Sequence, residues 1–507
     1  MNRNQRAPVL AIAIESAEAR LVEQMIEQGE LPTLRSLLAA GRWLRLESPA
    51  YIGTTTVWPS FMTGEEVAEH GIYSEYCWEP ATMSLSAFTG RDLKPFWKEL
   101  SHNGTSVGIV AVPFMPLVGV TNGFEISESE PYVLNGNGQH AISKQMAREA
   151  LSHGHISVSG PEDFNHLQEL AAGSLEGIRL RGRLAAALLA EKQPDLSVIV
   201  FSETHESAHC LWQTVEPEHP LFKEEFFRRL LEIRPTVKEI YQEVDRQIAK
   251  LREVAGRDAT VLVFALHGMK PARGVPTFLA PLMCEAGFCS VANLKNQSWK
   301  GRSIQLLAAA KRRTPAALKK IYYRTMPAAT VKGAALPTLM PRYDWSRTRA
   351  FSLVTEQHGS IRVNLIGREA EGIVPVAEYG SVCGEVAAWL STLQAEDGTP
   401  LAKKIIQTAD NGKQALRRRI PDVLVHWEDD AFLSPLRIKG SDVDFYSDGR
   451  RYLSQHTSEG FCILSGGTEV EVDDVLPVKD LGRLITRILT GWSRLEGAAS
   501  DREPAAL

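Results

Sequence analysis

The chain has 507 residues, of which 44% are hydrophobic and 23% are charged, and its formal net charge is −5. This composition is ordinary for a globular protein and excludes collagen-like and intrinsically disordered chains. The negative net charge gives no general electrostatic reason to expect a nucleic acid polymer as a partner, so any binding of anions must be local.

The N-terminal segment reads as a strand and not as a signal peptide. Its short apolar run ends at Glu15, and no small-residue cleavage site follows. No stretch approaches the roughly 20 apolar residues that a membrane-spanning helix needs. We therefore expect a soluble, cytoplasmic protein with no membrane partner. The six cysteines are scattered and form no C-x-x-C pair, so we expect reduced thiols.

Four continuous apolar runs predict buried strands. They are VLAIAI (9–14), TSVGIVAV (105–112), LSVIVF (196–201) and TVLVFAL (260–266). Continuous runs that alternate with helical patterns favour parallel strands covered on both faces by helices, hence an open α/β sandwich. Glu15, His205 and His267 follow three of these strands closely. Ligands of open α/β sheets bind at the carboxyl ends of the strands, so we expect the chemistry there.

A hydroxyl-rich segment, IGTTTVWPSFMTGEEVAEHGIY, occupies residues 52–73. A hydroxyl at a helix N-terminus meets free backbone N–H groups and a positive dipole, which stabilise an alkoxide and an incoming phosphate. Thr54 is therefore a candidate nucleophile. On local grounds alone, Thr54, Thr55 and Thr56 fit an N-cap cluster better.

The segment FSETHESAHCLW (201–212) places His205 and His209 four residues apart. On a helical turn both imidazoles project from one face and can hold one metal ion. The string is also H-E-x-x-H, the zinc-metalloprotease signature, with Glu206 as the base. Against a protease, the pair closely follows a buried strand, and no H-x-x-G-x-x-H extension continues past His209. Two incidental histidines are the alternative for so short a match.

Three further histidines stand near strand ends or in loops. His267 follows the strand at 260–266, His456 lies in SQHTSEGFCILSGG, and His70 lies in EHGIY. A single histidine of this kind is more often a hydrogen-bonded structural residue than a ligand. A role as metal ligands becomes the better interpretation because several histidines and Glu15 fall at strand ends of one predicted sheet.

A basic segment and a tail complete the chain. Between Gly287 and Arg342 there is no Asp or Glu, while Lys and Arg recur. We expect a basic helical insertion at 287–343, with a solvated surface as the simplest interpretation. The alternative is a lid or partner-binding segment that attracts an anionic substrate. Residues 491–507 are expected to form a flexible tail.

The order of the motifs resembles that of one family. From about residue 8 to about residue 470 the chain contains, in order, GELPTLRSLLAAGRW, TTTVWPSFMTGEEVAEHGIY, SVGIVAVPF, PDLSVIVFSETHESAHCLW, TVLVFALHGM, SIRVNLIGREAEGIV, IPDVLVHW and HTSEGFCILSGG. This order is similar to that of bacterial type I phosphodiesterases and nucleotide pyrophosphatases of the alkaline phosphatase superfamily. The resemblance implies an alkaline-phosphatase-like sandwich with a central, mostly parallel sheet covered by helices. It implies one discontinuous catalytic domain at 8–286 and 344–490, interrupted by the insertion.

The resemblance also implies a nucleophile and two adjacent metal sites. In the family an Asp ends the first strand, a Thr or Ser begins the helix, Asp-x-x-x-His and Asp-His-Gly follow later strands, and a late His completes the metal sites. Carried onto this chain, these places hold Glu15, Thr54, His205 with His209, Leu266 with His267, and His456. Glu15, His205 and Leu266 each replace an Asp.

These departures remove negative charge from the expected metal sites. The family pattern offers three carboxylates to two divalent ions, whereas this chain offers one. Ions about 4 Å apart need anionic ligands between and around them. Because Leu266 cannot ligate, Glu15, His267 and Thr54 are left as a thin second site. We therefore expect one tightly bound ion and a weakened second site.

The first site keeps a complete ligand set. His205, His209 and His456 offer three imidazoles and leave an open position for water or substrate, which is the arrangement of catalytic zinc. Zinc is the favoured ion, and iron or manganese are alternatives.

Three functions compete. The first is a metal-dependent hydrolase or transferase that acts on a phosphodiester, pyrophosphate or related ester of a small or nucleotide-like molecule, with Thr54 attacking phosphorus. The second is a repurposed single-metal protein on the same fold, because two metal carboxylates are missing. The third is an H-E-x-x-H zinc protease.

Overall fold

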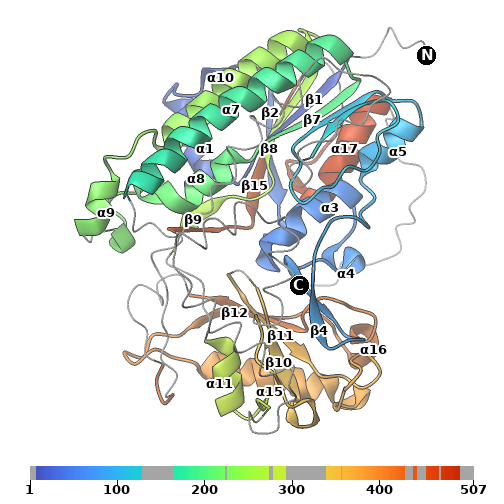
Figure 1. The fold of residues 1–507 in the computed structure, drawn as a ribbon, viewed down its shortest axis with the longest axis vertical. Coiled ribbons are helices and arrows are strands. Elements are labelled where there is room, and N and C mark those ends of the chain that lie inside the picture. The colour runs from blue at the N-terminus through green and yellow to red at the C-terminus, as the bar shows by residue number, and fades with distance from the viewer. Residues whose placement is uncertain are drawn as a thin grey trace.

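The computed structural model describes residues 7–127, 164–222, 225–272, 278–292, 339–355, 357–428, 438–441, 453–466 and 470–491. These residues form two lobes, each with its own sheet (Figure 1). None of the helices within these ranges combines the length and the apolar character needed to cross a membrane. The predicted insertion at 287–343 falls mostly outside the described residues, and the predicted tail at 491–507 almost entirely.

The larger lobe is built on an eight-stranded sheet with the strand order β16-β2-β15-β8-β1-β7-β5-β6. Its strands are β1 (Val9–Ile14), β2 (Gly41–Glu47), β5 (Val107–Val110), β6 (Gly123–Ile126), β7 (Leu196–Phe201), β8 (Thr260–Ala265), β15 (Glu459–Ser465) and β16 (Val475–Pro477). All neighbours in this sheet are parallel except for the pairs that β15 makes with β2 and β8. The four predicted runs are β1, β5, β7 and β8. The prediction of a central, mostly parallel sheet is confirmed.

Helices cover both faces of this sheet, which explains why the strands are apolar throughout. Alternate residues of β1 face two different cores, with Leu10 and Ile12 on one side and Val9 and Ala11 on the other. The first face carries α1 (Ala19–Glu27), α2 (Pro32–Ala39), α7 (Phe164–Lys192), α8 (Glu203–Leu211), α9 (Glu225–Leu230) and α10 (Val237–Ala255). The second carries α3 (Val57–Thr63), α5 (Phe96–His102) and α17 (Val478–Thr490) (Figure 1).

The smaller lobe has an antiparallel sheet with the order β10-β11-β13-β12 and a separate hydrophobic core. Its elements are β10 (Ala350–Leu353), β11 (Gly359–Val363), β12 (Ala402–Gln407), β13 (Val423–Trp427), α11 (Leu279–Glu285), α15 (Tyr379–Thr392) and α16 (Gly412–Ala415). The hairpin of β3 (Tyr76–Glu79) and β4 (Ser84–Ala87) and the short α4 (Val67–His70) add to it. Trp78 of the hairpin packs on Phe351 with ring centroids 4.9 Å apart. The domain limits expected from the sequence do not separate this lobe from the larger one.

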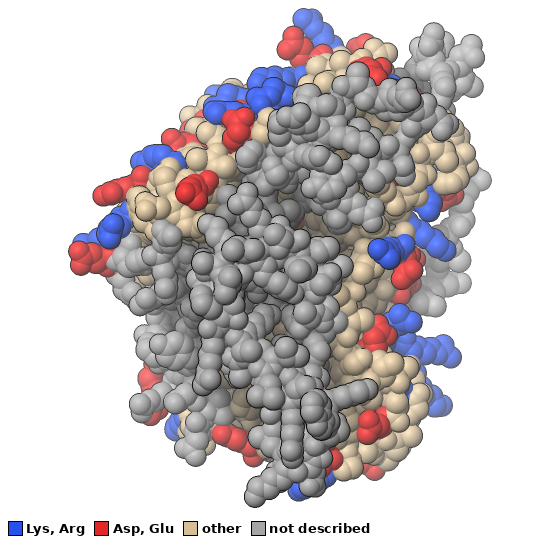
Figure 2. Space-filling model, viewed as in Figure 1, with Lys and Arg blue, Asp and Glu red and all other residues tan. Residues whose placement is uncertain are grey.

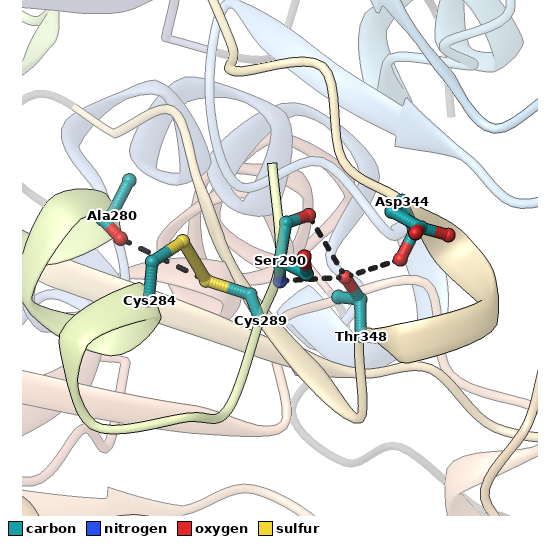
Figure 3. The surroundings of a disulfide bond; sticks show 6 residues. All are labelled: Ala280, Cys284, Cys289, Ser290, Asp344 and Thr348. Carbon is teal, nitrogen blue, oxygen red and sulfur yellow. Dashed lines mark hydrogen bonds between the residues drawn. A yellow bond between two sulfur atoms is a disulfide. The ribbon is translucent and has the colours of Figure 1, made fainter. Parts of the chain in front are cut away.

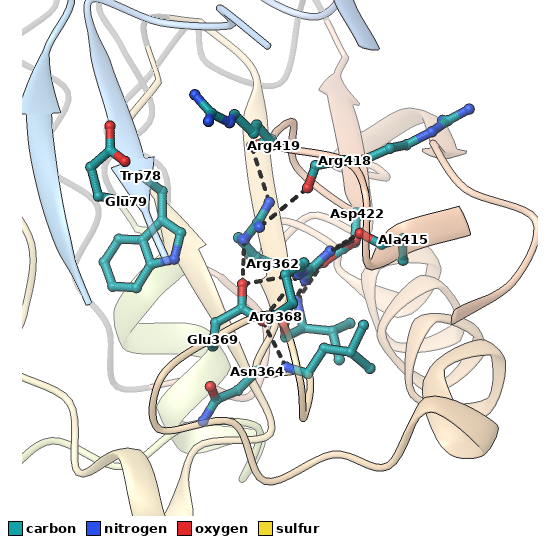
Figure 4. Close-up of polar contacts among 12 residues, drawn as sticks. Trp78, Glu79, Arg362, Asn364, Arg368, Glu369, Ala415, Arg418, Arg419 and Asp422 are labelled. Carbon is teal, nitrogen blue, oxygen red and sulfur yellow. Dashed lines mark hydrogen bonds and ion pairs between the residues drawn. The ribbon is translucent and has the colours of Figure 1, made fainter. Parts of the chain in front are cut away.

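A network of ion pairs, here called the arginine–carboxylate network, lies inside the smaller lobe (Figure 4). Arg368 contacts both carboxylate oxygens of Asp422, at 2.8 and 2.6 Å. Arg362 donates to Glu369 at 2.6 Å and to backbone carbonyls near the start of β13. Tyr379 also donates to Asp422, at 3.1 Å. Each buried charge therefore has an opposite charge and hydrogen-bond partners beside it, as a buried ion pair requires.

Cys284 and Cys289 form a disulfide at the end of α11 (Figure 3). The expectation of reduced thiols is therefore wrong for this pair, while Cys77, Cys210, Cys383 and Cys462 are free. The chain turns back directly after α11, and this brings the two Cα atoms within 4.6 Å. A spacing of five residues carries no sign of such a turn, so the sequence did not reveal the pair.

The two ends of the basic segment meet beside this disulfide. The amide of Ala292 donates to the carbonyl of Arg342 at 2.8 Å, and Val291 pairs with Tyr343 as an antiparallel bridge. The segment thus leaves and re-enters the smaller lobe at one place, as an insertion does. The expected helices of 293–338 lie outside the described residues.

Candidate metal centre and active site

Sheet topology brings the predicted site residues to one edge. β1, β7 and β8 are parallel, so the residues that follow them lie together. β15 runs antiparallel to β8, so the residues that precede β15 reach the same edge. The residues concerned are Glu15 after β1, His205 and His209 after β7, His267 after β8, and His456 before β15. His456 also ends β14 (Ser454–His456), which pairs with β9 (Met269–Pro271) directly after His267.

Three of these side chains form a compact three-histidine cluster. The Nε2 atom of His205 lies 3.0 Å from that of His209 and 3.2 Å from that of His456. The Nε2 atoms of His209 and His456 are 3.1 Å apart. Two of the histidines lie one turn apart on α8, and the third comes from a strand almost 250 residues later, at a separation of 247 from His209.

The cluster fits one divalent metal ion. Ligand nitrogens that each lie about 2.0–2.1 Å from one zinc ion are separated by about 3 Å, which is the spacing of these Nε2 atoms. Nδ1 of His209 lies 3.0 Å from the carbonyl of Ser454, which can only accept, so this nitrogen carries the proton and Nε2 presents its lone pair. Nδ1 of His456 is buried without a hydrogen-bond partner. The tautomer and the hydrogen bond of His209 are therefore those that a metal-binding imidazole needs, whereas Nδ1 of His456 lacks such a bond.

The surroundings keep two of the three imidazoles, those of His209 and His456, in their neutral form. Burial lowers the pKa of His209 to about 4, although its bond to the Ser454 carbonyl acts in the opposite direction. Burial and the neighbouring imidazoles hold the pKa of His456 well below its usual range. Neutral imidazole is the form that binds metal ions.

Glu15 and His267 lie beside the cluster, and the ring centroid of His267 is 4.6 Å from that of His456. His267 Nε2 is 3.6 Å from Glu15 Oε1, and both side chains are buried. The indole N–H of Trp58 donates to both oxygens of Glu15, at 3.0 and 2.9 Å. Leu266 packs in the core of the larger lobe, at 2% exposure. Throughout the described ranges, the three-histidine cluster is the one group of at least three His, Cys, Asp or Glu side chains that converges closely enough to share an ion.

Thr54 begins a 3₁₀ turn that leads into α3. Gly53 precedes it and packs so closely that a Cβ there would lie 2.1 Å from the carbonyl oxygen of Tyr73. Thr56 stands at the N-cap position of α3, but its hydroxyl makes no cap bond and donates to the carbonyls of Pro49 and Gly53 instead. Thr54 is half-buried and lies four residues before Trp58, the residue that contacts Glu15. Its role as the nucleophile stays a prediction.

The smaller lobe contacts two loops of this site. Gln357 accepts a hydrogen bond from the backbone N–H of His456 at 2.9 Å and donates to its carbonyl at 3.2 Å. His426 of β13 donates through Nε2 to the carbonyl of Tyr51, three residues before Thr54, at 2.7 Å. One lobe thus supports the backbone of a candidate metal ligand and the loop of the candidate nucleophile.

A cavity of about 870 Å³ lies between the lobes and reaches His456. Side chains of both signs line it, among them Lys270 and Lys403 with Glu216 and Glu428. On the face shown in Figure 2, acidic and basic residues are likewise interspersed over the described surface. The volume suits a small molecule.

Sequence reasoning missed the residues that support the site. Trp58 stands in the quoted Thr-Thr-Thr-Val-Trp-Pro string, so its position was visible but its contact with Glu15 was not. Gln357 binds the backbone of His456, and Ser454 binds His209 through its own backbone carbonyl. No sequence motif marks either residue. Only the fold reveals these contacts.

Comparison with known proteins agrees with this architecture. The phosphonoacetate hydrolase of Sinorhizobium meliloti, solved in complex with phosphonoformate, is similar in fold with a TM-score of 0.53 at 14% sequence identity, covering 96% of each chain. Human ectonucleotide pyrophosphatase / phosphodiesterase 5 matches with a TM-score of 0.47 at 10% identity, covering 97% of each chain. No curated protein sequence matches the chain. The sequence profile described as type I phosphodiesterase / nucleotide pyrophosphatase matches residues 9–434. The chain therefore belongs to the type I phosphodiesterase / nucleotide pyrophosphatase family, a family of enzymes.

Proposed function

We propose that this chain is a metal-dependent hydrolase or transferase that acts on a phosphodiester, pyrophosphate or related ester of a small or nucleotide-like molecule. The observation that carries the proposal is the three-histidine cluster, whose Nε2 atoms lie within 3.2 Å of one another at the carboxyl edge of the sheet. Family membership supports the class of reaction. The cytoplasmic location expected from the sequence is part of the same proposal.

In this proposal His205, His209 and His456 hold one divalent ion, with zinc favoured over iron or manganese because three imidazoles with an open position suit zinc. The bound ion supplies Lewis acidity beside the phosphoryl group. The hydrogen bond from His209 to Ser454 and the two bonds from Gln357 to the His456 backbone hold two of the ligands in place.

Thr54 is the proposed nucleophile. Its hydroxyl oxygen forms a bond to phosphorus, the ester P–O bond breaks, and the departing oxygen takes up the proton that the hydroxyl loses. Water then cleaves the threonine–phosphoryl ester, or an acceptor alcohol does so in a transferase. Thr56 is not available for this step, because its hydroxyl is bonded to two backbone carbonyls.

A repurposed single-metal protein is the second candidate. It is favoured by Leu266, an apolar core residue at a place where the family has a metal-binding carboxylate. A zinc protease fits less well, because the family is established and the H-E-x-x-H string coincides with two of the family's ligand positions.

The test is turnover of an aryl phosphodiester by Thr54→Ala, with Thr56→Ala as the matched control. Because a missing nucleophile removes the covalent route, we expect Thr54→Ala to lower the rate at least about a thousandfold with unchanged metal content. Thr56→Ala should keep most of the rate. Retention of more than about a tenth by Thr54→Ala would assign the attack to water.

Chelation distinguishes the candidate functions. Turnover that disappears with a chelator and returns with zinc supports the hydrolase. A protein that binds metal but turns over no phosphate ester favours the repurposed site. Cleavage of casein would favour the zinc-protease function instead.

A further inference from the structure

The carboxylate of Glu15 is occupied by a neighbouring side chain. One indole N–H, that of Trp58, lies 3.0 Å from Oε1 and 2.9 Å from Oε2. A donor at nearly equal distance from both oxygens stands between them, where a metal ion bound by both oxygens would lie. A hydrogen bond to a charged carboxylate is also stronger than a neutral one.

Trp58 is fixed in that position. Its side chain is 1% exposed, and its ring packs edge-on against Phe61 with centroids 5.6 Å apart. Phe61 packs in turn on Phe264 of β8, with centroids 5.5 Å apart. An ion bound by both oxygens of Glu15 could displace the indole only by disturbing this close-packed core.

Few donors remain for a second ion. His267 Nε2, 3.6 Å from Glu15 Oε1, is one candidate partner. The preceding residue, Leu266, has no donor atom. Among the His, Cys, Asp and Glu side chains that the structure describes, no third one joins Glu15 and His267. With the Thr54 hydroxyl, the third donor expected from the sequence, a second site has one carboxylate, one imidazole and one neutral hydroxyl, which is a weaker set than the His, Cys and carboxylate ligands of zinc sites.

We propose that the indole of Trp58 closes the Glu15 carboxylate to a metal ion that binds through both oxygens and so disfavours a second site, leaving one tightly bound ion, at the three histidines. Glu15 is then the acceptor that Trp58 holds and not a ligand, and Trp58 is a positioning residue that acts through Glu15. The inference rests on the proposed function, in which the three histidines bind the first ion. It also means that restoring the family's carboxylate with Leu266→Asp does not by itself restore a second site.

The first test is the metal content of Glu15→Gln, measured by elemental analysis after dialysis against a trace of zinc. The amide oxygen of Gln still accepts the Trp58 N–H, while the charge that would hold an ion is gone. We expect the content of wild type, one zinc per chain, and a zinc affinity within about threefold of it. His209→Ala is the positive control that loses zinc. Loss of zinc from Glu15→Gln would overturn the inference.

The second test is zinc stoichiometry in Trp58→Phe, Leu266→Asp and the double variant. Because both obstacles must be removed, we expect one zinc in Leu266→Asp and two in the double variant. Trp97→Phe is the matched control, since Trp97 is equally buried in the same core but its contacts are with Phe61 and Phe96. A second zinc in Leu266→Asp, bound as tightly as in the double variant, would refute the role of Trp58.

If Leu266→Asp fails to fold, the single variant Trp58→Phe tests the inference. We expect its affinity for a second zinc or cobalt ion to exceed that of wild type by at least about tenfold, because the ion no longer has to replace a charge-assisted hydrogen bond to the Glu15 carboxylate. An unchanged affinity sinks the inference. Failure of the proposed function looks different: wild type would bind no zinc, or His209→Ala would keep it. A second tightly bound zinc in wild type would contradict the closed carboxylate and leave the first site intact.

Discussion

The three-histidine cluster of the larger lobe and the arginine–carboxylate network of the smaller lobe are both buried groups of ionisable side chains. The network contains cations and anions in contact, so its charges compensate one another within the protein. The cluster contains basic groups alone, with three Nε2 atoms that face one point. Buried charges that are paired within the protein are accounted for as part of a stable core. Buried basic groups gathered on their own indicate a binding site for a cation.

Electrostatics separates the two regions in the same way. Burial raises the pKa of Asp422, but the charge and hydrogen bonds of Arg368 outweigh it and leave that pKa below its usual value. The carboxylate therefore stays charged in the folded protein. Burial lowers the pKa of His209 to about 4, so that imidazole stays neutral. The arginine–carboxylate network therefore keeps its own charges, whereas the neutral histidines can bind a cation from solution.

Removing one ligand should have the largest effect on this contrast. His209→Ala and His456→Ala each leave two imidazoles, so we expect both to lose bound zinc on dialysis and to lower turnover by about a thousandfold or more. The melting temperature of the metal-loaded protein should fall too, because a ligand that binds the native state stabilises it. His102→Ala, at an exposed position on α5, is the control. Full zinc occupancy in either cluster variant would show that the three nitrogens do not share an ion.

Breaking the network should change stability and leave the metal alone. Arg368→Ala leaves Asp422 buried without its main partner, which costs about 3–5 kcal/mol of unfolding free energy. Arg349→Ala removes an exposed pair with Glu385 and should cost less than about 1 kcal/mol. Urea unfolding and zinc content, measured together, check both. Loss of zinc in a folded Arg368→Ala would mean that the two regions are coupled.

The sequence predicted the larger lobe well and the smaller lobe poorly, for a physical reason. Strands buried on both faces, such as β1 and β7, are apolar throughout and stand out from the helical patterns around them. The strands of the smaller lobe are less uniform, and β12 reads Ala-Lys-Lys-Ile-Ile-Gln with its lysines exposed. Their pairing depends on contacts between distant segments, which no local pattern reveals.

The candidate site shows the same division. Glu15, His205 and His267 were predicted to meet because parallel strands end at one edge, and His456 was placed with them by the family resemblance. The structure brings all four to one edge. Their assignment to ligand sets is a separate matter. Trp58 holds Glu15 by a hydrogen bond that depends on how α3 packs against the sheet. Such a contact has no sequence period, and neither has that between Gln357 and His456.

Lowering the pH should weaken the cluster before the network. The folded pKa of His209 lies below that of the unfolded chain, so as pH falls from about 6.5 to about 4 the unfolded state takes up the proton first and stability is lost. Asp422 has a lowered folded pKa, so its contribution is present above about 3.8 and is lost only below that value. Urea unfolding of metal-free protein at a series of pH values measures this. His209→Ala should show a shallower decline between pH 6.5 and 4, and an identical decline would contradict the assignment.

The smallest expected effect concerns the link between the two lobes. Gln357 holds the backbone N–H and carbonyl of His456 from the smaller lobe. Gln357→Ala removes both bonds, so the His456 ring is less well fixed, and we expect zinc affinity to fall by roughly ten- to a hundredfold, as for other supporting groups of metal ligands. Gln357→Glu keeps an acceptor for the N–H but no donor for the carbonyl, so its affinity should lie between those of Gln357→Ala and wild type. Gln407→Ala is the control, because that amide donates to the carbonyl of Ala409, two residues past the end of β12 and within the smaller lobe. Competition with a chelating dye measures the affinities. Equal zinc affinity in wild type and Gln357→Ala would mean that the larger lobe alone positions the ligands, and that the smaller lobe contributes only the far wall of the cavity.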